Sequence, residues 1–250
     1  MYKLLKESFL NKNINELDKL SIFYIYIFFS TILIILTLIY CNIFINKFDI
    51  IDVNYKILLK KLEFEYGSLV YNIYNYWEYS FVDDEGIKYH LKRLPIFPIL
   101  IVLLTKISKN IFFIFICKSL ILFSVLFLCV LITSKSLRLN SFFFCLFFLP
   151  FLIPYNLHVV LNIHFADSII AILLPSLFIL LFTNNSKKYF LISFIFFLLY
   201  LTKNSVLLIV MILPIVIFLI ENDKLILKSL PILGAILAII SWGIFGIIKT

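Results

Sequence analysis

The feature that most constrains this chain is an uninterrupted apolar stretch near its beginning. Residues 22–45 contain no charged side chain. A helix that crosses a bilayer needs about 20 apolar residues, each adding about 1.5 Å, to cover about 30 Å of hydrocarbon. Residues 22–45 are therefore long enough to cross a membrane as one helix.

The composition excludes most soluble classes of protein. Hydrophobic residues make up 63% of the 250-residue chain and charged residues 14%, whereas soluble domains have about 25% charged residues. This excludes a soluble enzyme, a disordered chain and a disulfide-rich secreted module. The four cysteines lie inside apolar runs without metal-ligand spacing, which is typical of buried thiols.

Further apolar runs predict an all-α fold, a polytopic helix bundle with seven membrane crossings. After residues 22–45, the predicted crossings are 111–133, 141–155, 165–183, 189–202, 205–220 and 225–248. Residues 94–108 begin with two prolines and end with lysines. We expect this segment to be a helix that lies against the outer leaflet and turns into the span at 111.

The charges between these runs predict how the chain is oriented. Residues 1–21 are read as a cytoplasmic lead-in. Residues 47–93 carry seven basic and eight acidic side chains and are expected outside, as a long first loop with interfacial helices. The short inner loops would then carry the lysine and arginine excess typical of cytoplasmic loops, which explains the net charge of +8 without nucleic acid. The prediction is one multi-pass domain, 1–250, in a plasma or inner membrane, with its helix bundle at 94–250 and its N-terminus in the cytoplasm.

The outer loop opens with an apolar stripe of helical period between residues 51 and 62, which indicates an interfacial helix. Asp52 lies in its first turn and Asp49 just before it. Either carboxylate could simply cap the helix. Alternatively, one could act as a general base at the mouth of a membrane cavity.

Two further features of the loop allow a structural and a functional interpretation. The aromatic cluster at 71–79 suits an interfacial belt or a platform for a sugar ring. The loop closes with His90, Lys92 and Arg93 before a proline-rich apolar segment. These cations could anchor the chain at the interface or hold a phosphate, because guanidinium offers two parallel donors to its oxygens.

Charges inside apolar spans need a partner or a task. The predicted topology places Asp167, just after His164, and Lys203 at the outer side, and Lys118 roughly 10 Å into its span. Together with Asp52 and Arg93, they would gather at one depth. A structural ion-pair network could explain this, but a polar cavity for an anionic lipid head group explains it as well.

The order of these elements resembles the GT-C membrane glycosyltransferases, in the branch of dolichyl-phosphate-mannose–protein mannosyltransferases and aminoarabinose transferases. The resemblance rests on Asp52 in the first loop, the loop ending Arg93-Leu94-Pro95-Ile96-Phe97-Pro98, Asp167 opening a span, and Leu201-Thr202-Lys203 opening another. Members of this family commonly run longer, so the resemblance implies that the chain is a minimal or truncated member.

The resemblance implies an inverting transfer of a sugar from a polyprenyl-phosphate donor at the extracytoplasmic face. Asp52 would deprotonate the acceptor and Asp167 would face the same cavity. Arg93, with Lys92 and Lys203, would hold the lipid phosphate. The acceptor, whether glycan, lipid or protein, stays open. Two alternatives remain: a transporter or flippase of lipid-linked sugars, and a catalytically silent membrane subunit.

No cofactor is required by this chemistry. Asp49, Asp52 and Asp167 could supply oxygen ligands to Mg²⁺ or Mn²⁺, but no tight carboxylate motif demands a metal. Metal dependence is therefore left open.

Overall fold

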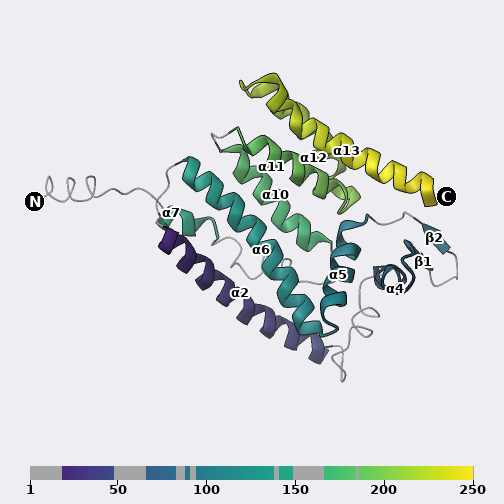
Figure 1. Ribbon diagram of the computed structural model, residues 1–250. Helices are drawn as coiled ribbons and strands as arrows, with labels where there is room; N and C mark the ends of the chain where they lie inside the picture. The colour runs from purple at the N-terminus through teal and green to yellow at the C-terminus, as the bar shows by residue number, and fades with distance from the viewer. Residues whose placement is uncertain are drawn as a thin grey trace, which may run out of the picture.

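The computed structural model describes residues 19–47, 66–82, 88–90, 94–137, 141–148, 166–183 and 186–249. In this part of the chain the structure is helical apart from one two-stranded hairpin (Figure 1). The all-α prediction is therefore confirmed in its main part.

Within the described ranges, three helices are long and apolar enough to cross a membrane. They are α2 (Lys19–Lys47), α6 (Ile111–Ser136) and α13 (Leu225–Lys249). By length and hydropathy, their candidate spans are Ser21–Ile43, Ile111–Ser136 and Leu225–Ile244. These three helices coincide with predicted crossings to within a few residues, and they indicate a protein embedded in a membrane.

Four further apolar helices are shorter. They are α5 (Ile96–Ile107), α10 (Asp167–Leu181), α11 (Lys188–Tyr200) and α12 (Leu207–Ile220), the last preceded by the 3-10 turn η1 (Asn204–Val206). At about 1.5 Å per residue, helices of 12 to 15 residues fall short of the hydrocarbon thickness. The seven-crossing topology accordingly stays a prediction. Only the first part of the predicted crossing 141–155 is described, as α7 (Ser141–Leu146).

The predicted outer loop, residues 47–93, contains one helix and one hairpin among its described residues. The helix α4 spans Tyr66–Tyr76, and the strands β1 (Ser80–Val82) and β2 (Lys88–His90) pair antiparallel, with Ser80 opposite His90. The hairpin was not predicted, because strands of three residues are too short to show a period-two pattern. The predicted helix at 51–62 lies outside the described residues.

The helices pack in a sequence of neighbours across the bundle. The contacts run from α2 to α6, α6 to α10, α10 to α11 and α11 to α13, with α12 against α13 (Figure 1). Phenylalanine rings fill the junction of α2, α6 and α7. The ring centroids of Phe29 and Phe148 are 5.0 Å apart, and those of Phe127 and Phe144 are 5.3 Å apart. Such aromatic pairs add to the stabilisation by burial alone.

The helices α11 and α13 approach each other closely at Gly234. A Cβ atom placed on Gly234 would overlap the backbone oxygen and the hydroxyl of Ser193. Small residues permit this approach, as is common where helices associate within membranes. Ala235 and Ala238 on α13 are also buried.

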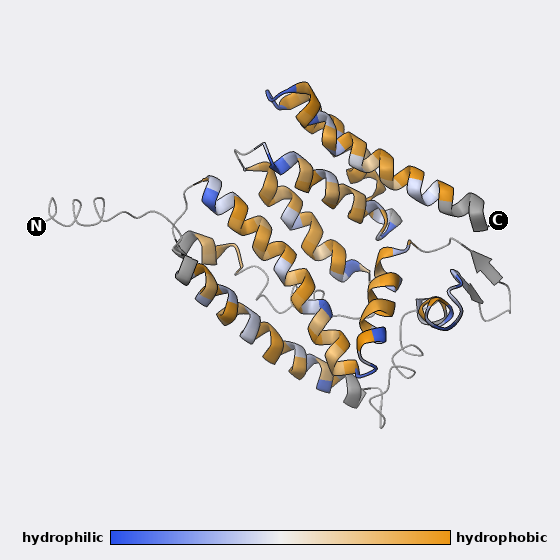
Figure 2. Cartoon of the chain, viewed as in Figure 1, coloured by the Kyte–Doolittle hydropathy of each residue, from blue (hydrophilic) through white to orange (hydrophobic). Residues whose placement is uncertain are grey.

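Large apolar side chains cover much of the outer surface of the helices, including Phe28, Ile43, Phe190, Leu208 and Leu219. Figure 2 shows the helix shafts as predominantly hydrophobic and the hydrophilic segments mainly near helix ends. A soluble protein rarely exposes apolar patches of this extent. This surface is the one expected to face lipid tails.

The bundle has two ends of different character (Figure 1). At one, here called the hairpin end, lie α4, β1, β2 and the first residues of α6 and α10. At the other, here called the lysine end, lie the last residues of α6 and the first residues of α11 and α13. The lysine end carries the described lysines of the predicted inner loops: Lys135, Lys187, Lys188, Lys224 and Lys228.

Candidate functional site

The structure joins two of the predicted site residues at the hairpin end. Asp167 is the first residue of α10, and Lys203 lies in the turn between α11 and η1. The Lys203 ammonium donates to both carboxylate oxygens of Asp167, at 2.7 and 2.9 Å. The side chains remain 40% and 43% exposed, respectively, so a ligand can reach both.

The local structure explains why these charges suit this position. Asp167 lies in the first turn of α10, where the unpaired backbone N–H groups favour a negative charge. An ammonium group has three N–H donors. After two bonds to Asp167, Lys203 keeps one donor for an anionic ligand.

The turn that carries Lys203 is held in place by the segment that ends the outer loop. The backbone N–H of Ile96 donates to the carbonyl oxygen of Leu201 at 3.1 Å. Thr202 is completely buried, and its hydroxyl donates to the carbonyl oxygen of Leu198 at 2.7 Å. The loop ending at 94–98 and the Leu201-Thr202-Lys203 element, far apart in sequence, therefore meet.

Lys118 differs from the other predicted site residues in its exposure. It lies seven residues after the start of α6, and none of its surface is accessible. Its burial agrees with the predicted depth inside the bundle. A side chain without accessible surface does not contact a ligand in this conformation, however, so Lys118 supports the bundle interior rather than the exposed pair.

The remaining predicted site residues are Asp49, Asp52, Lys92, Arg93 and His164, and all of them lie outside the described residues. His90 is described only by its backbone, which pairs with Ser80 in the hairpin. The predicted cluster is thus represented by one ion pair and one buried lysine, and its full assembly stays a prediction.

The aromatic cluster divides into an exposed and a buried part. Trp77, just after α4, is 72% exposed and has a φ of 56°, a left-handed conformation common after a helix end. The ammonium of Lys106 lies 3.6 Å from the centroid of its ring, which is a cation–π contact. Tyr71 and Tyr76 are exposed beside it, with ring centroids 6.2 Å apart. These three aromatic residues form what we call the aromatic shelf.

Tyr79 is a buried packing residue and is not part of the aromatic shelf. It is buried, and its ring packs edge-on against Trp242 of α13, with centroids 5.7 Å apart. Burial raises the pKa of the Tyr79 hydroxyl above its ordinary value, and Tyr66 adds to the shift. The contact ties the outer loop to the last helix of the bundle.

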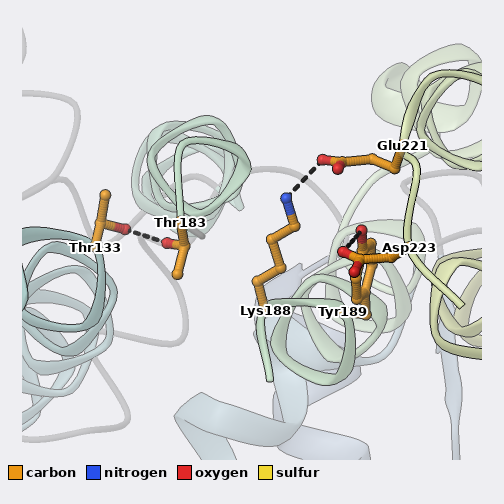
Figure 3. A network of polar contacts seen from close by, with 6 residues as sticks. All are labelled: Thr133, Thr183, Lys188, Tyr189, Glu221 and Asp223. Carbon is orange, nitrogen blue, oxygen red and sulfur yellow. Dashed lines mark hydrogen bonds and ion pairs between the residues drawn. The ribbon is translucent and has the colours of Figure 1, made fainter. Parts of the chain in front are cut away.

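A second polar network, which sequence reasoning missed, lies at the lysine end (Figure 3). Lys188 donates to Glu221 at 2.6 Å, and the Tyr189 hydroxyl donates to Asp223 at 2.6 Å. The sequence held a signal for this network, because Glu221 and Asp223 are the only acidic residues after Asp167 and stand close together between two apolar runs. Lys188 is nearly buried, so this network fixes α11 to the turn between α12 and α13.

Two threonines add a further contact at this end. The hydroxyls of Thr133 and Thr183 are 2.7 Å apart and join the end of α6 to the residue after α10 (Figure 3). Both side chains are buried, so the contact satisfies polar atoms that would otherwise destabilise the core.

Within the described ranges, no three His, Cys, Asp or Glu side chains gather as a metal site would require. All four cysteines are free thiols. Two of the three predicted metal ligands, Asp49 and Asp52, lie outside the described residues, so metal binding stays an open prediction.

Comparisons of the chain with family models, with curated proteins and with solved structures find no match. The fold and the geometry at the hairpin end are therefore the basis for a functional conclusion.

Proposed function

We propose that this protein is a membrane-embedded glycosyltransferase that takes a sugar from a polyprenyl-phosphate donor, with its site at the hairpin end. The proposal is supported chiefly by one junction. The Lys203–Asp167 ion pair and the Ile96–Leu201 hydrogen bond bring together three of the segments on which the resemblance to GT-C enzymes rests.

The charges at this junction suit a phosphate leaving group. When the sugar is transferred, the bond between its anomeric carbon and the phosphate oxygen breaks, and the phosphate keeps the electron pair. Cations placed beforehand beside that oxygen stabilise the developing charge. Lys203 would supply one such cation, and Lys92 and Arg93, which precede Ile96 by a few residues in sequence, would supply others.

Two carboxylates have separate tasks in this proposal. Asp52 takes the proton from the acceptor hydroxyl as that oxygen attacks the anomeric carbon from the opposite side, which inverts the configuration. Asp167 orients Lys203, because it holds two of the three ammonium protons. It is therefore a positioning residue.

The aromatic shelf gives secondary support. Tyr71, Tyr76 and Trp77 are exposed on the element that precedes the hairpin. A sugar ring has an apolar face that stacks on such rings and polar edges that face water. The shelf would hold the donor sugar or a glycan acceptor.

The first experiment measures whether the hairpin end recognises the phosphate. Purified protein in nanodiscs is titrated with decaprenyl phosphate and with decaprenol, and complexes are counted by native mass spectrometry. We expect a preference for the phosphate that falls about tenfold in Lys203→Gln, because a charge-assisted hydrogen bond is lost. Lys109→Gln removes an exposed charge at the same end and is the matched control. Equal binding of the two lipids by the wild type would overturn the proposal.

The second experiment separates an enzyme from a flippase or a silent subunit. Asp52→Asn is assayed for transfer of labelled sugar from polyprenyl-phosphate sugars in membranes and for lipid binding as above. A transferase loses turnover and keeps binding, because only the base is removed. Full transfer by Asp52→Asn would refute the base assignment, and lipid movement without transfer by the wild type would identify a flippase.

A further inference from the structure

A cavity of about 600 Å³ lies between α6 and α11 at the lysine end. It is lined by Ile132, Lys135, Ser136, Lys187, Phe190 and Leu191. Its volume lies within the range of about 300–1,000 Å³ that holds small ligands in proteins. The cavity is at the opposite end of the bundle from Asp167 and Lys203, so the proposed sugar transfer does not use it.

The lining follows the same spacing on both helices. On α6 the three residues stand at positions i, i+3 and i+4, and the same spacing relates Lys187, the residue just before α11, to Phe190 and Leu191 in its first turn. Residues at this spacing share one face of a helix. The cavity is therefore bordered by one face of the end of α6 and by one face of the start of α11.

The direction of the two helices gives the cavity a polar and an apolar half. α6 runs toward the lysine end and α11 runs away from it (Figure 1). Lys135, Ser136 and Lys187 therefore lie nearest the end of the bundle. Ile132 and the two apolar residues of α11 lie one turn deeper, toward the middle. The lining thus changes from cationic to apolar along the direction in which a membrane changes from head groups to acyl chains.

Among the described residues at this end, the acidic side chains are engaged by residues of α11 outside the cavity lining. Glu221 accepts from Lys188, and Asp223 accepts from Tyr189 (Figure 3). Lys188 and Tyr189 occupy the two positions between the cavity residues Lys187 and Phe190. Both charged residues of the cavity lining are cations, and both are exposed.

We propose that this cavity binds an anionic phospholipid, with the phosphate between Lys135 and Lys187 and an acyl chain along Ile132, Phe190 and Leu191. The two ammonium groups, with three N–H donors each, can donate to phosphate oxygens. Basic pockets between membrane helices on the cytoplasmic side bind anionic head groups in this way. The apolar half selects a lipid over a free phosphate, since a free phosphate would leave it unfilled.

The test compares lipids and matched variants in one assay. Delipidated protein is titrated with phosphatidylglycerol, phosphatidylcholine and glycerol 3-phosphate, and retained molecules are counted by native mass spectrometry. We expect the wild type to prefer phosphatidylglycerol over both others. Lys135→Gln with Lys187→Gln should lower its affinity for phosphatidylglycerol about tenfold or more. Lys135→Arg with Lys187→Arg should restore it, because both charges return.

Lys224→Gln with Lys228→Gln is the control, because it removes two charges at the same end outside the cavity lining. If the control and the cavity variant lose equal affinity for phosphatidylglycerol, the lipid is attracted by the overall charge of this end, and a specific site in the cavity is ruled out. Equal binding of glycerol 3-phosphate would overturn the role of the apolar half.

Leu191→Trp tests the same site without changing its charge. The larger ring fills the apolar half and should also lower phosphatidylglycerol binding, whereas unchanged binding would contradict the proposal. Decaprenyl phosphate binding at the hairpin end should be unaffected by all of these variants, so the two proposals fail separately.

Discussion

Lys203 holds both carboxylate oxygens of Asp167, yet about two-fifths of each side chain stays exposed to solvent. Exposed ion pairs contribute little to stability because water screens them and their side chains must be ordered. This pair joins the start of α10 to the turn between α11 and α12 but adds little to the stability of the fold. Its exposed groups are therefore well placed to bind a ligand.

The first prediction distinguishes a ligand-binding role of the Asp167–Lys203 pair from a structural role. Asp167→Asn and Lys203→Gln should each change the free energy of unfolding by less than about 1 kcal/mol. Chemical denaturation of both single variants and the double variant measures the coupling between them. A coupling of several kcal/mol would show that the pair is chiefly a structural tie.

The second prediction concerns the network at the lysine end. Lys188 is 7% exposed and its partner Glu221 is 28% exposed. Lys188→Met should destabilise the protein by about 1–3 kcal/mol, because the carboxylate loses its partner in a partly buried site. Lys224→Met removes an exposed cation nearby and should have little effect. Thermal unfolding followed by circular dichroism compares the two, and equal losses would contradict the assigned contact.

The third prediction uses a pair of glycines on α13. Gly234→Val should cost about 1–3 kcal/mol, because the added atoms overlap Ser193 and force α11 and α13 apart. Gly243→Val introduces the same side chain where no atom lies within 4 Å of the added Cβ. It should be tolerated or slightly stabilising, since valine in a helix costs less than glycine. Comparable destabilisation by both variants would disprove the close α11–α13 contact.

The fourth prediction concerns alkaline pH. Burial raises the pKa of Tyr79 in the folded protein above its ordinary value of 10.0. Below about pH 10, the hydroxyl is neutral in the folded and unfolded chains alike. As the pH rises further, the unfolded chain releases this proton first, so the free energy of unfolding falls.

Tyr79→Phe removes the titrating group and should make the loss of stability above pH 10 less steep. Denaturation curves between pH 8 and pH 12 measure it. Identical alkaline slopes for the variant and the wild type would show that Tyr79 does not remain buried and neutral.

Much of the helical structure could be predicted from local pattern. The predicted run 111–133 became α6, and 225–248 became α13, because long apolar stretches leave a helix as the favoured way to satisfy backbone hydrogen bonds in lipid. The same reasoning could not predict the hairpin, whose strands are three residues each.

The candidate site was predictable only as a set of residues that needed partners. The cost of a charge in an apolar span singled out Asp167 and Lys203. Their pairing could not be read from the sequence, because it depends on contacts between segments far apart in the chain. Burial depends on which helices pack around a side chain, and that is set by contacts between distant segments.

Hydropathy and the placement of charge along the chain determined that this protein is helical and suited to a membrane, because both depend on each residue and its near neighbours. The tertiary structure decided which ends of the helices meet. It placed Ile96 against Leu201, and it brought the end of α6 and the start of α11 to the border of one cavity that carries two lysines. Such contacts follow from the packing of whole helices, and no local stretch of sequence contains that information.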